Sequence, residues 1–196
     1  MLEKSPGRKK FGTRQITIIG MLSAISIVLG ATGIGFIPLP MVKATFMHVP
    51  VIIGALIEGP IVGLCIGVIF GIFSIIQNIT NPSLLFFAFI NPLVSVLPRA
   101  LIGITTYYSY KLPFLKKEVL KIGLGAAIGS LTNTVGVLGA IYLLYADKYA
   151  SATNISVDAA GKAILGVAVV NGLPEALIAV LITIPIVLAV RGIRKR

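Results

Sequence analysis

The stretch ITIIGMLSAISIVLG, residues 16–30, is interrupted only by small residues and hydroxyl-bearing side chains and carries no charge. Its apolar positions do not alternate with polar ones, as they would in a strand of an outer-membrane barrel. A helix needs about 20 predominantly apolar residues to cross the hydrocarbon core of a bilayer. The stretch therefore predicts a membrane-spanning α-helix.

Apolar stretches of this kind recur along the whole chain of 196 residues, of which 57% are hydrophobic and 12% are charged. We predict an all-α integral membrane protein with six transmembrane helices, at residues 16–36, 44–58, 60–78, 84–109, 118–145 and 160–190. They form a single membrane domain, residues 16–190. A basic N-terminal segment, residues 1–15, precedes it, and a basic tail, residues 191–196, follows it.

The net charge of +11 comes from Lys and Arg residues that cluster before the first predicted helix, after the fourth and at the C-terminus. A nucleic-acid-binding protein would instead spread its cations over one folded face, so we expect no nucleic-acid partner. In membrane proteins, such clusters mark the cytoplasmic side. The clusters and the even number of crossings both predict cytoplasmic N- and C-termini.

Motifs for catalysis or nucleotide binding are absent from the sequence. It has no G-x-x-x-x-G-K-[ST] loop, no H-E-x-x-H pair and no G-x-S-x-G turn. One histidine, His48, and one cysteine, Cys65, offer no basis for a metal cluster or an intramolecular disulfide. We expect a protein that is not an enzyme and needs no cofactor, and any ATP-derived energy must come from a partner.

Small residues recur at four-residue spacing in several predicted helices, for example Gly63, Gly67 and Gly71, or Gly20 and Ala24. In a bilayer, such rows let two helix backbones approach closely. We expect most of them to pack within the protein, with contact to another membrane subunit as the alternative.

Two charged residues, Arg99 and Glu175, lie inside predicted helices, each 15 residues from the start of its span. At ~1.5 Å per residue both would lie about 22 Å below the outer surface. Because an unpaired charge at mid-bilayer costs at least ~2.5 kcal/mol, we predict a structural ion pair between them. Direct contact of Arg99 with a ligand is the alternative. The preceding Pro98 lacks an N–H, which leaves the carbonyl of Val94 free to accept from Arg99, water or a ligand.

Three segments of the chain resemble a known family: ATFMHVPVIIGALIEGPIVGLCIGVIFGIFSII, NPLVSVLPRALIGI and VNGLPEALIAVLI. They resemble the substrate-binding (S) components of energy-coupling factor (ECF) transporters, in the group that includes riboflavin and pantothenate carriers. The resemblance implies a six-helix protein of the bacterial plasma membrane that binds a water-soluble vitamin or precursor near the outer face. It also implies a transmembrane coupling subunit and two cytoplasmic ATPase subunits as partners. Gly20 and Ala24 resemble the family's subunit contact, with glycine where alanine is usual.

On this hypothesis the binding pocket lies in the outer half of the protein, beneath the loop of residues 36–43. We expect polar residues of the spans and one loop lysine to line it: Lys43, Gln77, Asn91, Ser95, Asn133 and Asn171. Lys43 could meet a carboxylate and few aromatic residues are available for a flat ring, which favours pantothenate over riboflavin. Two alternatives stay open. One is a stand-alone proton-coupled transporter with Glu175 as proton carrier, and the other is a membrane scaffold without a small ligand.

Overall fold

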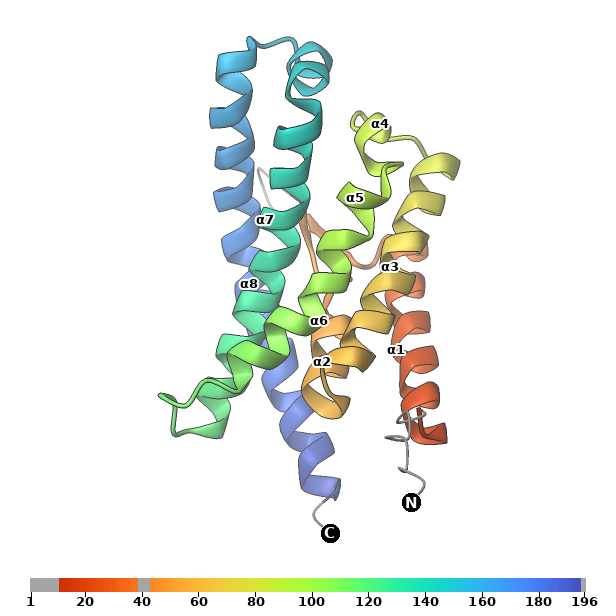
Figure 1. Cartoon of the computed structure of the whole chain (residues 1–196), viewed down its shortest axis with the longest axis vertical. Coiled ribbons are helices and arrows are strands. Elements are labelled where there is room, and N and C mark those ends of the chain that lie inside the picture. The colour runs from red at the N-terminus through yellow and green to blue at the C-terminus, as the bar shows by residue number, and fades with distance from the viewer. Residues whose placement is uncertain (1–10, 39–42, 195–196) are drawn as a thin grey trace, which may run out of the picture.

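A computed structural model describes residues 11–38 and 43–194, but not the side chains of residues 36–38, 43 and 44. Its elements are α1 (Thr13–Thr32), β1 (Phe36–Pro38), β2 (Lys43–Thr45), α2 (Val49–Glu58), α3 (Pro60–Thr80), α4 (Phe86–Phe89), α5 (Pro92–Ser95), α6 (Leu97–Tyr110), α7 (Glu118–Thr153) and α8 (Val157–Arg194). The helices form one elongated bundle (Figure 1). The start of α1 and the end of α8 lie at the same end of it, as an even number of crossings requires.

Between α1 and α3 the chain forms a β-hairpin and the short helix α2, which lie one above the other. Gly33 ends α1 in the left-handed conformation, with φ 74°, and the chain then turns into β1. The strands β1 and β2 form an antiparallel hairpin that pairs Phe36 with Thr45. The 10-residue helix α2 lies below this hairpin in Figure 1 and extends only ~15 Å, about half of a membrane crossing. Because α2 ends below the hairpin, it does not fill the region beside and above the hairpin, and a site can form there.

The prediction of six continuous transmembrane helices is not confirmed. Within the described residues, four helices are long and apolar enough to cross a membrane: α1, α3, α7 and α8. The predicted span 84–109 is divided into α4, α5 and α6. The side-chain oxygen of Asn91 caps α5 by accepting from the N–H of Leu93, and Pro92 and Pro98 occupy the first turns of α5 and α6. Capping side chains and prolines favour new helix starts over one continuous helix.

The row of glycines on α3 packs against α5 and α6, as expected for internal packing. A Cβ atom added to Gly63 would lie 2.8 Å from the Cα of Gly103, and one added to Gly71 would lie 2.6 Å from the Cα of Val96. Side chains would not fit between backbones this close. The contact thus requires glycine, and it fixes the position of Arg99, which lies at its centre beside Gly67.

Ion pairs and hydrogen bonds at the end of the bundle where α8 finishes hold five helices together. Arg191 of α8 pairs with Glu118 and donates hydrogen bonds to the Tyr110 hydroxyl and the Leu56 carbonyl, each at 2.7 Å. Glu58 at the end of α2 pairs with Arg14 at 2.7 Å. These contacts join the ends of α1, α2, α6, α7 and α8.

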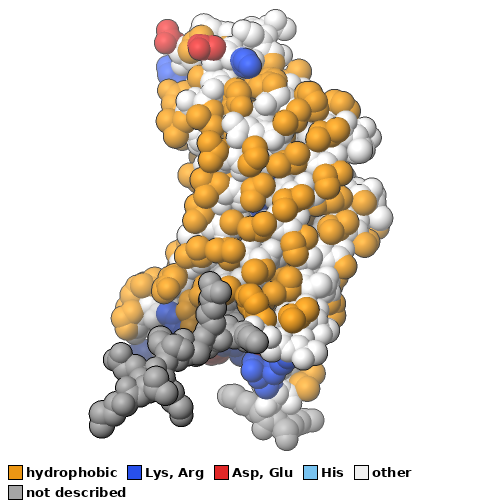
Figure 2. All heavy atoms as spheres, turned by 45° about the vertical axis from the view of Figure 1, so that its right-hand side comes forward, with side chains coloured by type: hydrophobic (Ala, Val, Ile, Leu, Met, Phe, Trp, Pro, Cys, Tyr) orange, Lys and Arg blue, Asp and Glu red, His pale blue; other side chains and the backbone are white. Residues whose placement is uncertain are grey.

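The outer surface of the bundle is apolar along its length. Figure 2 shows hydrophobic side chains covering the middle of the molecule and charged ones at its two ends. Large hydrophobic side chains are exposed on the long helices, including Val28, Leu143, Leu165, Leu177 and Leu181. A surface of this kind fits the lipid environment predicted from the sequence, because it would be unfavourable in water.

The glycine contact between α3 and α6 predicts the outcome of a substitution. In Gly67→Ala, the new Cβ would lie 2.8 Å from the carbonyl carbon of Arg99, so the helices must separate. We expect the free energy of unfolding to fall by about 1–3 kcal/mol, the usual cost of overpacking, measured as thermal denaturation in detergent. Gly139→Ala is the control, because a Cβ there meets nothing within 4 Å. Equal stability of the two variants would contradict the described packing.

Candidate functional site

A cavity of about 390 Å³ lies between α3, α6, α7 and α8, beside the end of β2. The hydrophobic part of its lining includes Met47, Phe70, Phe89, Val137 and Leu138. The polar and charged side chains of its lining are Thr45, Ser74, Gln77, Asn78, Asn81, Ser83, Arg99, Asn133, Thr134, Asn171 and Glu175. A hollow that combines hydrophobic side chains with several polar groups directed at one space is typical of a site for a small polar organic molecule.

Arg99 enters the cavity from the first turn of α6 and is only 7% exposed. Its Nη1 donates to the carbonyl of Ser95 at 2.7 Å and to that of Val94 at 3.4 Å. The second of these is the carbonyl that Pro98 leaves without a helical donor. The guanidinium also lies 5.1 Å from the ring centre of Phe70, and its Nε has no hydrogen-bond partner among the described residues. Carbonyls and an aromatic ring hold the cation without cancelling its charge.

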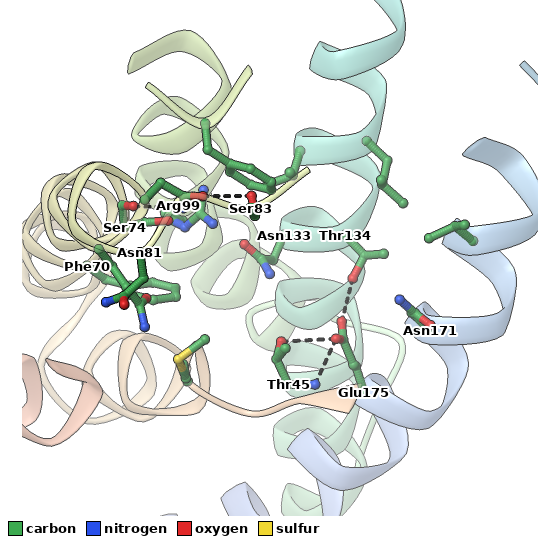
Figure 3. A pocket seen from close by; sticks show the side chains of 17 residues that line it. Thr45, Phe70, Ser74, Asn81, Ser83, Arg99, Asn133, Thr134, Asn171 and Glu175 are labelled. Carbon is green, nitrogen blue, oxygen red and sulfur yellow. Dashed lines mark hydrogen bonds between the residues drawn. The ribbon is translucent and has the colours of Figure 1, made fainter. Parts of the chain in front are cut away.

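Glu175 reaches the cavity from α8 and is 5% exposed. Its Oε1 accepts hydrogen bonds from the N–H of Thr45 at 2.9 Å and from the Thr45 hydroxyl at 3.0 Å. Its Oε2 accepts from the Thr134 hydroxyl at 2.8 Å (Figure 3). The carboxylate therefore joins the β1–β2 hairpin to α7 and α8.

The predicted ion pair between Arg99 and Glu175 is wrong for this structure. The ion pairs among the described residues are those of Glu58 and Glu118 with arginines. Figure 3 shows Arg99 and Glu175 on different walls of the cavity, with Asn133 between them. The estimate of equal depth assumed one continuous helix over residues 84–109, and that helix is broken before Arg99. The two residues belong to one site, but as separate charges.

Three of the predicted lining residues, Gln77, Asn133 and Asn171, do line the cavity. Gln77 also donates a hydrogen bond to the Gly30 carbonyl of α1 at 2.8 Å. Two others, Asn91 and Ser95, are outside the lining. The Asn91 amide donates to the Tyr145 hydroxyl at 2.9 Å, and the Ser95 hydroxyl donates to the Phe89 carbonyl at 2.6 Å. The side chain of Lys43 lies outside the described part of the structure.

Several lining residues were not among the predicted set: Thr45, Ser74, Asn78, Asn81, Ser83 and Thr134. The polar cluster at the end of α3 was visible in the sequence, and Thr134 is adjacent to Asn133. Nothing in the pattern indicated Thr45, because its position depends on the hairpin. Within the described residues, no group of three or more His, Cys, Asp or Glu side chains could hold a metal ion.

Two amide side chains in the cavity lack partners. The Oδ1 atoms of Asn133 and Asn171 are buried and accept no hydrogen bond from any described residue. Buried polar atoms normally find a partner, and each one left alone costs free energy. With the free Nε of Arg99, these atoms make a set of unpaired groups around one hollow, which indicates a site that a polar ligand completes.

Gly20 and Ala24, the predicted subunit contact, lie on an exposed face of α1. A Cβ added to Gly20 would meet nothing within 4 Å. Their contact with another membrane subunit stays a prediction.

The two asparagines Asn91 and Asn171 should respond differently to truncation. Asn91→Ala removes a helix cap and the bond to Tyr145, so we expect the free energy of unfolding without ligand to fall by about 1 kcal/mol or more. Asn171→Ala removes an unpaired oxygen, so stability without ligand should stay unchanged or rise. Thermal denaturation of both variants tests this. An equal loss for Asn171→Ala would mean that its side chain is structural.

Comparison with known proteins agrees with the resemblance inferred from the sequence. A family model described as "ECF transporter, substrate-specific component" matches residues 14–187. The chain is also 30% identical to the pantothenic acid transporter PanT of Lactococcus lactis subsp. cremoris (strain MG1363), in an alignment that covers 95% of this chain and 98% of that protein. The chain therefore belongs to the family of substrate-specific components of ECF transporters.

Proposed function

We propose that this protein binds pantothenate in the cavity around Arg99 and delivers it to partner subunits for ATP-driven import. The observation that carries the proposal is a buried arginine that faces the cavity and has no carboxylate partner among the described residues. An intramembrane charge of this kind is expected to serve a ligand. The similarity to a protein named as a pantothenic acid transporter supports the choice of ligand.

The polar groups of pantothenate are complementary to the polar side chains of the cavity lining. It carries one carboxylate at one end, an amide in the middle and two hydroxyls toward the other end. The planar guanidinium of Arg99 is suited to a carboxylate, and its Nε is free to donate. The unpaired Oδ1 atoms of Asn133 and Asn171 can accept from the ligand's amide and hydroxyl groups. The cavity volume of about 390 Å³ falls within the ~300–1,000 Å³ of ordinary ligand sites.

Riboflavin fits the cavity less well. Its flat ring system would need aromatic faces to stack on. The aromatic residues of the lining are Phe70 and Phe89, and both rings lie against the Arg99 guanidinium, at 5.1 and 6.0 Å. The ring of Phe87 packs instead against Tyr145, with centres 5.7 Å apart. These contacts favour pantothenate, and Lys43 remains proposed as a further contact to its carboxylate.

The family implies the partners that we propose: an ECF transmembrane coupling subunit and two cytoplasmic ATPase subunits. The exposed row of Gly20 and Ala24 on α1 is the proposed contact with the coupling subunit. We further propose a location in the bacterial plasma membrane with both termini in the cytoplasm, on the basis of the clustered Lys and Arg residues. On this proposal the chain itself catalyses no reaction.

The alternative of a proton-coupled transporter has less support. It requires Glu175 to release and take up a proton during transport, whereas three donors occupy its oxygens. The two halves of the sequence also show no inverted repeat of the kind found in many secondary transporters. A scaffold without a ligand would not explain unpaired polar groups around a cavity.

Binding of pantothenate should depend on the pairing of its carboxylate with Arg99. Arg99→Gln removes the charge, so we expect the dissociation constant to rise about 10- to 100-fold, since hydrogen bonds to charged groups contribute ~1.5–3 kcal/mol. Panthenol, in which CH₂OH replaces the carboxylate, should bind the unsubstituted protein more weakly by a similar factor. Isothermal titration calorimetry in detergent measures both effects.

Comparing the two ligands in each variant provides the control for these titrations. The Arg99→Gln variant should no longer distinguish pantothenate from panthenol, because the interacting group is missing on the protein. Asn91→Ala, outside the cavity lining, should bind both ligands as the unsubstituted protein does. Full preference for pantothenate in Arg99→Gln would rule out the proposed role of Arg99.

Transport should require the partner subunits. Vesicles that contain this chain alone should bind pantothenate but not accumulate it, because the sequence has no nucleotide-binding loop. Addition of the coupling subunit and the ATPases should give accumulation that depends on ATP. Accumulation by the chain alone under a proton gradient would favour the secondary transporter instead.

A further inference from the structure

We propose that Glu175 makes the cavity selective for ligands with one anionic end, and that it excludes a ligand whose distal hydroxyl carries a phosphate. The proposal rests on the proposed function, because it concerns the end of pantothenate that points away from Arg99. It assigns to Glu175 a role in specificity in addition to its contact with the hairpin.

The cavity has two charged lining residues among those described, and they lie on different walls. Arg99 belongs to the wall formed by α3 and α6, near Phe70 and Ser74 (Figure 3). Glu175 lies on the wall formed by α7 and α8, with Thr134 and Asn171. A carboxylate attracted to Arg99 therefore directs the other end of an extended ligand toward Glu175.

The carboxylate of Glu175 is held in place but its charge is not cancelled. Among the described residues it accepts three hydrogen bonds, all from neutral donors: the N–H and hydroxyl of Thr45 and the hydroxyl of Thr134. No lysine or arginine among the described residues pairs with it. An ionised carboxylate offers about four acceptor sites, so one remains for a ligand.

The wall around Glu175 includes a further acceptor. The Oδ1 atom of Asn171, four residues before Glu175 on α8, is buried and unpaired. Acceptors of this kind match the O–H donors of hydroxyl groups. A phosphate monoester at the same position would carry a charge of about −1.5 to −2 and three acceptor oxygens. It would meet a carboxylate of the same sign in a region with little water to screen the repulsion.

The test compares pantothenate with its 4′-phosphate ester, in which the terminal hydroxyl is phosphorylated. Calorimetric titration of the unsubstituted protein should give a dissociation constant about 100-fold or more higher for the ester. In Glu175→Gln this ratio should fall at least about tenfold, because the ester binds more tightly. Glutamine keeps the shape, and the threonine hydroxyls can either donate to it or accept from it.

Asp158→Asn is the matched control, because it neutralises an exposed carboxylate at the start of the same helix. It should leave the ratio unchanged. A second variant, Asn171→Asp, adds a negative charge to the same wall and should raise the ratio, so the test does not depend on how well Glu175→Gln folds.

Two results would overturn the inference while the proposed function stands. One is equal binding of pantothenate and the ester by the unsubstituted protein. The other is a ratio that stays constant in Glu175→Gln while both affinities fall, which would mean that Glu175 acts only by holding the hairpin. An unsubstituted protein that binds neither ligand would contradict the proposed function itself, and the inference with it.

Discussion

The burial of Arg99 without a counter-ion among the described residues is the constraint on which the rest of the site depends. A cation inside an apolar bundle is costly unless polar groups surround it. The chain meets this requirement with two backbone carbonyls and two aromatic rings. The carbonyl of Val94 is available because Pro98 lacks an N–H, and the backbone beside Arg99 is fixed because Gly67 lets α3 approach it. Because the cation is held without being neutralised, it stays available to an anion.

Glu175, on the opposite wall of the cavity, is likewise held by hydrogen bonds and has no counter-ion among the described residues. Three neutral donors support Glu175, and two of them come from Thr45 at the end of the hairpin. Its carboxylate is held by hydrogen bonds and forms no ion pair with any described lysine or arginine. The site therefore has Arg99 on one wall and Glu175 on the other, with the unpaired oxygen of Asn171 beside Glu175 and that of Asn133 between the two. This arrangement suits a ligand with a carboxylate at one end and hydroxyls at the other.

The membrane class of the protein could be predicted from the sequence because it depends on long apolar runs. The predicted spans 60–78 and 160–190 correspond to α3 and α8, and the glycine row on α3 packs internally as expected. The division of residues 84–109 was not predicted, although Asn91, Pro92 and Pro98 were visible. Each is tolerated within some membrane helices, so composition alone does not decide between a kink and a break.

The site was harder to predict because it depends on three-dimensional placement. Equal depth suggested that Arg99 and Glu175 would meet, but the broken helix places them on separate walls. The presence of polar side chains within apolar spans correctly identified Gln77, Asn133 and Asn171 as lining residues. The same criterion also suggested Asn91 and Ser95, but their side chains form hydrogen bonds to nearby backbone groups and to Tyr145 instead. Thr45 entered the site only through the hairpin, whose pairing has no strong sequence signal.

The most direct measurement is an experimental structure of the protein with pantothenate bound. We expect the ligand's carboxylate to lie within hydrogen-bonding distance of the Arg99 guanidinium, with its hydroxyls directed toward Asn171 and Glu175. A carboxylate bound away from Arg99, or a ligand bound outside the cavity, would contradict the role assigned to the buried arginine.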